Sequence, residues 1–517
     1  MKHSQVTRRD LLKLFGAVGL FAPLAKVFQH VDNQELGIGN SQTPNIIILL
    51  FDTLSAGHMG LYGYGRNTTP NIDKFAKTST VFHRNYSASN FTQPSTASLL
   101  TGVYPWSHRS LNFYTPLLKN FEKNNLFSNI NSNFFTQTYT HNTFVMTILE
   151  QFEDYIDQLK PVEDLVVYDS NHLPNFFAND YPMGFYAAKR WRDNYIGPSH
   201  SLFLNPVLSV LQSLASSQIQ KANTKKYPLG LVDNQESYIF KLEDAIDWIA
   251  KSTVSTAQPY LGYYHLLPPH EAYRPRADFV GMFTDDKFTL PEKEDHYFSR
   301  GETQDKLEKY RDRYDEYIAF VDSEFGRLYQ LLEENKTVDN TYFILTSDHG
   351  QLFERGIHGH GVTLFDHLLH IPLIIHAPDQ TQGKDVFTPT SIIDIMPTIL
   401  KLTDQDIPDW LEGKNLPLFE EPGDARRIIF SMDGRENHKM APLKKVTFSA
   451  IQWPYKLIHY RGYPGFDDVD ELFHLDNDPE ELDNLATSFP SIVAELKNEI
   501  LEQQRIAEIK SIGISID

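Results

Sequence analysis

Asp52, Asp348 and His349 are the residues whose types and positions most clearly suggest chemistry. Each follows an apolar run that is rich in β-branched residues, which is the pattern of a buried strand. Carboxylate oxygens and an imidazole nitrogen bind divalent cations, and three such ligands leave room for a substrate and a nucleophile. A single aspartate in such a place more often caps a turn or a helix. Two aspartates, each at the end of an apolar run, favour a metal site instead. Gly350 is expected to permit the sharp turn that lets both Asp348 and His349 reach one ion.

Thr92 is the candidate nucleophile. It stands just before Pro94 and Ser95, which can open a helix, so its hydroxyl is expected near a positive helix N-terminus. A free alcohol is a poor nucleophile at neutral pH, and coordination to a cation lowers its pKa enough for attack on sulfur or phosphorus. From the residues alone, a helix cap is the commoner role of such a threonine.

Three apolar runs, 45–51, 259–264 and 341–346, are expected to position these residues as central strands of a sheet. Ligands of open α/β sheets bind beyond the carboxyl ends of the strands, so the three runs predict one shared site. Helical patterns over 70–76 and about 310–334 lie between the runs. This alternation indicates a layered α/β domain with a mostly parallel sheet.

The chain is predicted to contain two structural parts, 44–420 and 421–517. Within the first, 150–235 is rich in aromatic residues and has no clear period, so we expect an irregular insertion over the site that contributes to substrate specificity. The second part contains alternating runs between 446 and 458 and a helical pattern over 491–506. These patterns predict antiparallel strands and a closing helix, which together form a small C-terminal α+β domain.

The N-terminus resembles a twin-arginine export signal over residues 1–30. Arg8 and Arg9 precede an apolar run over 14–24, which is shorter than the roughly 20 residues of a membrane span. We therefore expect the twin-arginine machinery as a partner and a periplasmic or extracellular protein, either free or tethered by an uncleaved signal. The alternative is an N-terminal helix in which the two arginines are accidental.

Composition excludes several classes of function. The 517 residues, 41% of them hydrophobic, are enough for a large core. Lysine and arginine total 47 against 67 acidic residues, a net charge of −20, so no nucleic-acid partner is expected. The absence of cysteine excludes disulfides, thiolate metal sites and a cysteine nucleophile.

Several motifs in order along the chain resemble the sulfatase family of the alkaline-phosphatase superfamily. The resemblance covers about Asn45 to Leu485 and implies an alkaline-phosphatase-like α/β/α sandwich with a central, mostly parallel mixed sheet. The motifs are Pro70-Asn71-Ile72-Asp73, the stretch 92–102, Ser347-Asp348-His349-Gly350, His358-Gly359-His360-Gly361 and the stretch 475–484.

The resemblance implies that Asp52, Thr92, Asp348 and His349 bind one divalent metal ion and that Thr92 is the nucleophile. Sulfatases suggest Ca²⁺, while oxygen-rich ligation with a single histidine also admits Mn²⁺, Mg²⁺ or Zn²⁺.

The resemblance further implies that His270 and His360 contact the anionic group and the leaving-group oxygen. Histidine suits both tasks because it can carry a positive charge or donate a proton near neutral pH. His265 and His358 are additional candidates for substrate binding, although a packed imidazole describes them better than it describes His270 and His360.

Three threonines depart from the family pattern. Thr92 stands where sulfate-ester hydrolases have a cysteine or serine that becomes formylglycine, Thr96 stands in place of an arginine, and Thr53 in place of an aspartate. Relatives with a threonine nucleophile, the lipoteichoic-acid synthases and phosphoethanolamine transferases, handle phosphoryl groups and have membrane helices that are absent here.

We therefore predict a soluble metal-dependent hydrolase of sulfate-type or phosphate-type esters. Its substrate is expected to be an anionic ester, either a small molecule or one linked to a glycan or lipid. A phosphoryl transferase and a catalytically inactive binding homologue remain alternatives, and the oligomeric state stays open.

Overall fold

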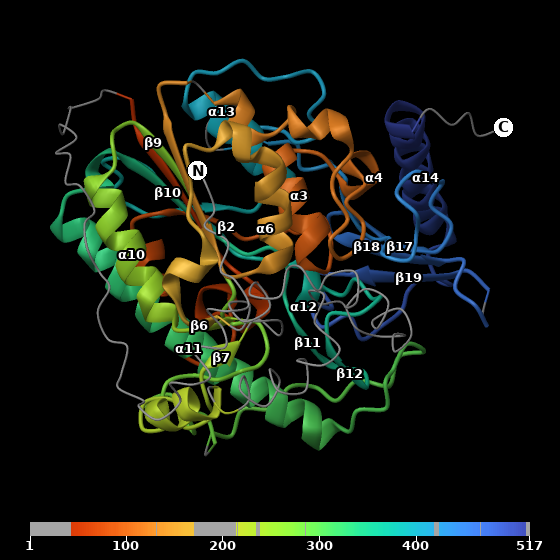
Figure 1. Cartoon of the computed structure of the whole chain (residues 1–517). Coiled ribbons are helices and arrows are strands. Elements are labelled where there is room, and N and C mark those ends of the chain that lie inside the picture. The colour runs from red at the N-terminus through yellow and green to blue at the C-terminus, as the bar shows by residue number, and fades with distance from the viewer. Residues whose placement is uncertain are drawn as a thin grey trace, which may run out of the picture.

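An eight-stranded mixed sheet forms the centre of the molecule in the computed structural model (Figure 1). Neighbouring strands are parallel except where β13 pairs with β10 and β2. The three predicted central strands are confirmed, and β1 lies between β9 and β10. In spatial order the strands are β14 (Lys384–Val386), β2 (Thr80–Phe82), β13 (Leu373–His376), β10 (Thr341–Thr346), β1 (Asn45–Phe51), β9 (Tyr260–Leu266), β4 (Phe135–Thr140) and β5 (Gln158–Leu159).

Helices cover both faces of this sheet, as the predicted α/β/α sandwich requires (Figure 1). Successive side chains of β1 alternate between two separate apolar clusters, because a strand points neighbouring residues to opposite faces. The first cluster includes residues of α3 (Thr92–Thr101), α6 (Thr143–Leu149) and α13 (Ile395–Leu402); the second includes residues of α2 (Pro70–Ala76), α10 (Leu242–Ser255) and α11 (Gln304–Glu334).

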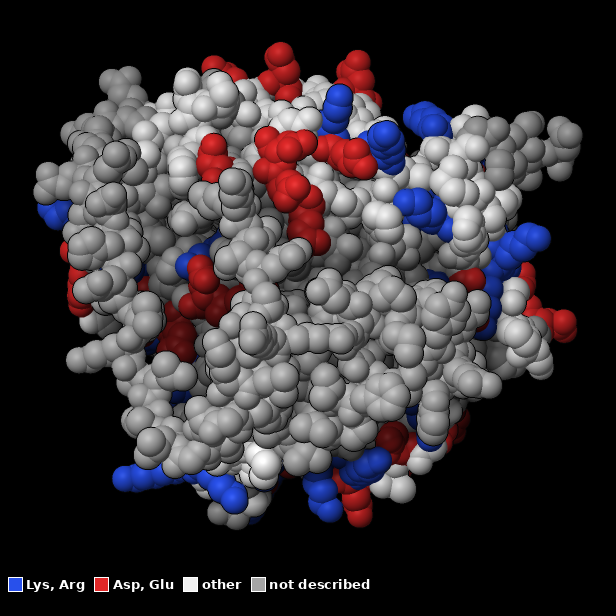
Figure 2. Space-filling model, viewed as in Figure 1, with Lys and Arg blue, Asp and Glu red and all other residues white. Residues whose placement is uncertain are grey.

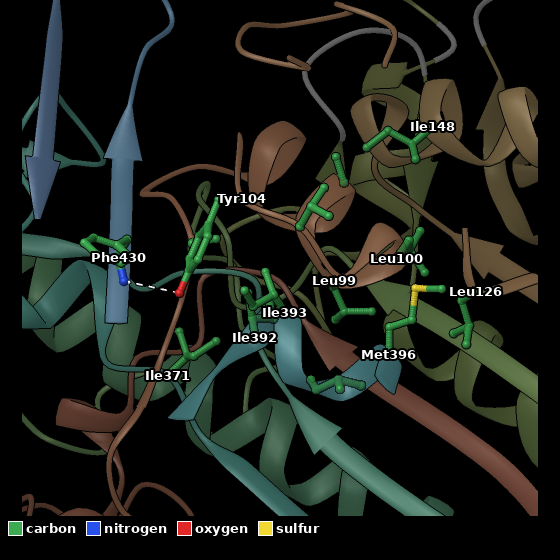
Figure 3. Close-up of a cluster of buried hydrophobic side chains, with 14 of the residues drawn as sticks. Leu99, Leu100, Tyr104, Leu126, Ile148, Ile371, Ile392, Ile393, Met396 and Phe430 are labelled. Atoms are coloured by element: carbon green, nitrogen blue, oxygen red, sulfur yellow. Dashed lines mark hydrogen bonds between the residues drawn. The ribbon is translucent and has the colours of Figure 1, made fainter. Parts of the chain in front are cut away.

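The first cluster holds α3, the helix that begins with Thr92. Leu99 and Leu100 of α3 are fully buried and pack in the same cluster as Met396 of α13 (Figure 3). In the same cluster the Tyr104 hydroxyl accepts a hydrogen bond of 3.3 Å from the backbone N–H of Phe430. The position of α3 therefore depends on residues from several distant parts of the chain.

The C-terminal part is the predicted α+β unit. Strands β16 (Ile429–Asp433), β17 (Val446–Gln452), β18 (Tyr455–Arg461) and β19 (Val469–His474) form an antiparallel sheet in sequence order, and α14 (Pro490–Ile512) closes the chain. It shares the first apolar cluster, to which Phe430, Met432 and Phe448 belong. Other residues of its strands, such as Ile429 and Ile458, lie in a third cluster with Phe365 of the larger part, so both apolar clusters of this sheet are shared with the larger part.

Short elements complete the fold. They are the pair β3 (Asn85–Tyr86) and β15 (Thr390–Ser391), the hairpin β11 (Leu352–Glu354) and β12 (Ile357–Gly359), and the helices α4 (Pro105–His108), α5 (Leu126–Asn129) and α12 (Asp366–Leu369).

The structure describes residues 43–130, 132–169, 214, 216–233, 238–284, 286–417, 423–465 and 467–512. The predicted signal segment 1–30 lies outside them, so the twin-arginine signal and export stay predictions. None of the helices in the described part is long and apolar enough to cross a bilayer.

Part of the 150–235 segment also lies outside the described residues. Its described ends contain regular structure: β5 joins the central sheet, and β6 (Val166–Asp169) and β7 (Val232–Asp233) both pair with β8 (Tyr238–Phe240). These strands are too short to produce a recognisable period, which explains why the sequence pattern predicts an irregular segment there.

Candidate active site

Asp52, Asp348 and His349 converge at the carboxyl ends of β1 and β10. One potential ligand atom from each lies within 4.8 Å of the others, and all three residues are buried. Nε2 of His349 is 3.8 Å from Asp52 Oδ1 and 3.5 Å from Asp348 Oδ2. The parallel pairing of β1 with β10, in which Leu50 is the partner of Thr346, brings these distant residues together.

The donor atoms of this cluster fit a divalent cation. Asp52 Oδ1 and Asp348 Oδ2 are buried and have no hydrogen-bond partner among the described residues, although a buried carboxylate oxygen normally has one. Nδ1 of His349 lies 2.8 Å from the carbonyl oxygen of Gly350, which can only accept. Nδ1 therefore carries the proton, and Nε2 keeps the lone pair that a metal ligand needs.

Thr92 lies beside the same atoms. Its Oγ1 is 3.5 Å from Asp52 Oδ2 and 3.3 Å from His349 Nε2. The N-cap of α3 is Phe91 and Thr92 is the first helical residue, so Thr92 does not take the alternative role of a helix cap. Ser95 in the first turn of α3 donates a hydrogen bond of 2.6 Å to the Asp348 carbonyl, which joins the helix to the cluster of Asp52, Asp348 and His349.

His265 and Asn142 both contact the Oδ2 atom of Asp52. His265 Nε2 lies 3.3 Å from Asp52 Oδ2 and its Nδ1 lies 3.1 Å from the Tyr263 hydroxyl, while Asn142 Nδ2 donates to Asp52 Oδ2 at 2.6 Å. Burial alone would raise the pKa of Asp52, but the hydrogen bond from His265 and the charge of His270 lower it to about 2. Asp52 is therefore ionised, and the contact of His265 is with this carboxylate.

Asn142 is a site residue that our sequence analysis missed. It stands two residues after β4, just as Asp52 and Asp348 stand after β1 and β10. The same rule of polar residues at the carboxyl end of a strand would have found it. The strand itself, with the sequence Phe-Thr-Gln-Thr-Tyr-Thr, lacks the continuous apolar run that marks β1 and β10.

His270 and His360 lie next to each other at the edge of the cluster. Their ring centroids are 5.3 Å apart, and the ring of His360 is 4.7 Å from that of His349. Burial holds the pKa of His360 well below its usual range, and the nearby histidines and arginines act in the same direction, so its imidazole is neutral at pH 7. Nδ1 of His360 lies 3.1 Å from Gln351 Oε1, which leaves Nε2 with a lone pair.

His358 occupies a different environment from the other predicted histidines. Its ring stacks on Tyr310 at 4.0 Å, and its Nε2 lies 3.1 Å from the Tyr273 hydroxyl. That hydroxyl accepts a hydrogen bond of 2.6 Å from Gln351, the partner of His360. His358 is thus connected to the cluster through two intermediate side chains, and its substrate-binding role stays a prediction.

Glycine is required at position 350 because two backbone segments approach closely there, and not because of the sharp turn that the sequence predicts. Its backbone is not in the left-handed region, and a Cβ at this position would lie 2.0 Å from the carbonyl oxygen of His367. Close approach of two backbone segments, rather than a special φ angle, therefore demands glycine. The left-handed residue of the site is the buried Thr53, with φ of 62°, whose N–H donates to Asp348 Oδ1 at 3.1 Å.

A cavity of about 400 Å³ adjoins the site at Asn142. Its lining includes Tyr114 and the carboxylates of Glu150, Glu153 and Glu163. Acidic side chains also gather on the face over α6 (Figure 2). This side of the site therefore disfavours the binding of a second negatively charged group.

Two family models match most of the chain. The family model described as Sulfatase matches residues 44–405, and the one described as N-sulphoglucosamine sulphohydrolase, C-terminal, matches residues 357–506. The chain is similar to sulfatase YidJ of Escherichia coli, with 24% identity over 463 residues that cover 86% of this chain and 83% of that protein.

The chain is also similar to the choline-sulfatase of Rhizobium meliloti, with 24% identity over 474 residues that cover 86% and 82% of the two chains. The solved structure of a phosphonate monoester hydrolase from Agrobacterium radiobacter shares the fold, with a TM-score of 0.62 and 18% identity, and the match covers 90% of this chain and 96% of that one. Because the sulfatase model matches well over half of the 517 residues, the chain belongs to the sulfatase family.

Proposed function

We propose that the protein hydrolyses a sulfate-type or phosphate-type ester with Thr92 as its nucleophile. The main support is the position of Thr92 Oγ1, within 3.5 Å of both Asp52 and His349 in a buried cluster. A divalent cation held by Asp52, Thr92, Asp348 and His349 would lower the pKa of the threonine hydroxyl and offset the negative charge of the ester.

The reaction takes two displacements. In the first, Thr92 Oγ forms a bond to sulfur or phosphorus, the ester oxygen leaves, and the proton lost by Thr92 is balanced by one gained by the leaving group. In the second, water attacks the same atom, the bond to Thr92 breaks, and Thr92 regains its proton. The net change is addition of water across the ester bond.

The two histidines at the edge of the cluster have complementary tasks in this scheme. His270 is proposed to hold the non-bridging oxygens of the ester. His360 is neutral and its Nε2 has a lone pair, so it can accept a proton and return it to the leaving-group oxygen. Gln351 holds the ring of His360 through Nδ1 and so orients Nε2.

A threonine nucleophile is compatible with sulfate-type and with phosphate-type esters. Formylglycine is an aldehyde and needs an unbranched side-chain carbon, whereas Cβ of Thr92 carries a methyl group, so the aldehyde route of other sulfatases is closed. Hydrolysis of the covalent intermediate by water is open to sulfur and to phosphorus. A choline-sulfatase and a phosphonate monoester hydrolase among the similar proteins support testing both.

The test compares Thr92→Ala with Thr92→Ser on an aryl sulfate, an aryl phosphate and an aryl phosphonate, each with Ca²⁺, Mg²⁺, Mn²⁺ and Zn²⁺. Thr92→Ala should lower kcat by about a thousandfold or more on every substrate that the protein hydrolyses. Thr92→Ser keeps a hydroxyl and should retain measurable turnover. Undiminished turnover by Thr92→Ala would exclude Thr92 as the nucleophile, and product analysis with added glycerol separates hydrolysis from transfer.

A further inference from the structure

Two arginines from different parts of the chain flank the peptide that follows His360. Arg435 stands two residues after β16, and its Nη2 donates to the Gly361 carbonyl oxygen at 3.0 Å. Arg300 stands before α11, and a Cβ built on Gly361 would lie 3.8 Å from Arg300 Nη2. Both guanidinium groups therefore lie beside Gly361, next to the histidine that is proposed to serve the leaving group.

The guanidinium group of Arg435 is hydrogen-bonded through Nε and Nη2 and keeps Nη1 as a donor without a partner among the described residues. Its Nε and Nη2 contact the carboxylate of Asp433 at 3.1 and 2.9 Å, and its guanidinium lies 4.4 Å from the centre of the Phe91 ring. Phe91 directly precedes Thr92, so this stacking couples Arg435 to the start of α3. Nη1 makes no hydrogen bond within the described part of the chain.

The C-terminal end of β16, which precedes Arg435, is itself hydrogen-bonded to the segment that precedes Thr92. The N–H of Met432 donates to the Ala88 carbonyl at 3.0 Å, and the Ser89 hydroxyl donates to the Met432 carbonyl at 2.7 Å. Arg435 therefore has a defined position relative to Thr92, although the two residues are far apart in sequence.

Arg300 is a charged side chain without an acidic partner. It is exposed and forms no ion pair among the described residues, and its Nη1 donates to the His358 carbonyl oxygen at 3.5 Å. Its backbone N–H donates to the Gly356 carbonyl at 2.9 Å, which fixes its loop on the hairpin β11–β12. Asp433 offsets the charge of Arg435, so Arg300, Arg435 and Asp433 together leave a net positive charge beside Gly361. The cavity at Asn142, in contrast, is lined by acidic residues.

We propose that Arg300 and Arg435 form an anion-binding subsite for a second negatively charged group, a carboxylate, sulfate or phosphate, on the leaving-group side of the substrate. Guanidinium groups suit this task because their N–H donors match the oxygens of such anions. The inference rests on the proposed function in one respect, the placement of the ester at Thr92. It narrows the substrate to esters with at least one further anionic group.

The test measures binding, which does not require turnover. Benzenesulfonate and benzene-1,3-disulfonate are stable mimics with one and two anionic groups, and calorimetry at low ionic strength gives their Kd values. The wild-type protein should bind the disulfonate roughly tenfold more tightly, as expected for a charge-assisted hydrogen bond. Arg300→Gln should reduce this ratio, and Arg300→Gln combined with Arg435→Gln should bring it close to one.

Two controls separate recognition from other effects. Because Arg435→Gln alone leaves the buried Asp433 without its partner, it is paired with Asp433→Asn to keep the local charge balanced. Arg505→Gln removes an equal charge from the exposed face of α14 and should leave the ratio unchanged.

The outcomes are distinct from those of the nucleophile test. Thr92→Ala should keep the preference for the disulfonate even when its catalysis is lost. Equal affinity of the wild-type protein for the two sulfonates, absence of disulfonate binding, or an unchanged ratio in the double arginine variant would each overturn the subsite.

Discussion

At the scale of single residues, the site concentrates negative charge that the described residues only partly balance. Asp52 receives hydrogen bonds from His265 and Asn142, yet its other oxygen has no hydrogen-bond partner in the described ranges, and Asp348 presents a second such oxygen nearby. Two buried carboxylates this close repel each other unless a cation lies between them. Stability and metal binding should therefore be coupled.

Removal of divalent ions should lower the stability of the wild-type protein. An ion at 100 times its Kd adds about 2.7 kcal/mol, which thermal unfolding with and without EDTA can measure. Asp348→Asn should abolish this metal-dependent increment because it removes a ligand and a charge. Asp247→Asn, at an exposed position, should keep it. An increment that survived in Asp348→Asn would contradict the assignment of the ligands.

A second acidic group shows the opposite arrangement. Glu354, His367 and Glu480 also lie close enough to share an ion, but the ammonium of Lys293 lies 2.6 Å from Glu354 and 3.0 Å from Glu480. The buried lysine already supplies the positive charge. We therefore interpret this group as a structural ion-pair network.

The network should contribute stability that depends on pH. Burial alone would raise the pKa of Glu354, but Lys293 and His367 lower it from 4.5 to about 2. A carboxyl group with a lowered pKa stabilises the fold fully above its unfolded value, so this contribution is present above pH 4.5 and is lost as the pH falls towards about 2.

Lys293→Met should destabilise the protein by about 3 to 5 kcal/mol at pH 7, because it leaves buried carboxylates without their partner. Most of this difference from the wild type should disappear in acid, when Glu354 is protonated in both proteins. Urea unfolding between pH 2 and 7 measures the effect. Lys306→Met, which removes an exposed pair with Glu302, should change stability by less than about 1 kcal/mol. A pH-independent difference would show that Lys293 acts through packing alone.

At the scale of elements, the site depends on close approach between the turn after β10 and the segment of α12. Gly350 lies in that turn, and its N–H donates to the Leu368 carbonyl at 2.8 Å. There is no room for a side chain between the two backbones. The turn thus places His349 by contact with α12 as well as by its own conformation.

Gly350→Ala should force these backbones apart at a cost of about 1 to 3 kcal/mol. Because His349 is the preceding residue, kcat/KM and metal affinity should fall as well. The unfolding midpoint in urea and the metal content of the purified variant are the measurements. Gly57→Ala is a matched control, since a Cβ there would meet its nearest neighbour at an ordinary 3.6 Å. Normal metal content in Gly350→Ala would contradict this role of the turn.

At the scale of the whole molecule, the two parts of the chain share one core. Phe430 of the C-terminal sheet packs with Trp106 at a ring distance of 5.4 Å and lies in the same cluster as residues of α3 and α13. Arg109 and Glu508, both fully buried, add an ion pair between the segment after α4 and helix α14. The parts should therefore unfold together.

Phe430→Ala should lower the free energy of unfolding by about 3 to 5 kcal/mol by creating a cavity at the junction. The midpoints from tryptophan fluorescence and from far-UV circular dichroism should shift by the same amount, because one transition involves both parts. Phe489→Ala, at a more exposed position, should have a much smaller effect. Separate transitions in the two signals would mean that the parts unfold independently.

Local sequence patterns are enough to predict the framework of the protein and the group of polar residues at its centre. Continuous apolar runs that end in polar residues are local signals, so they identify β1, β9 and β10 together with Asp52 and Asp348. His349 is identified with them because it is adjacent to Asp348, and the order of the family motifs supports Thr92 as a further member of that group. The C-terminal strands and α14 were equally clear, because their alternation and periodicity lie within single elements.

The other side chains that meet at this group are known only from the three-dimensional fold. Gln351 and the two arginines beside Gly361 come from separate segments, and no local pattern distinguishes them from ordinary surface or turn residues, while Asn142 follows a strand that lacks a continuous apolar run. The reason for glycine at position 350 likewise lies in a backbone segment that is distant in sequence. Contacts of this kind follow from strand order and register, which depend on the packing of the whole chain, whereas strand and helix patterns depend on neighbouring residues alone.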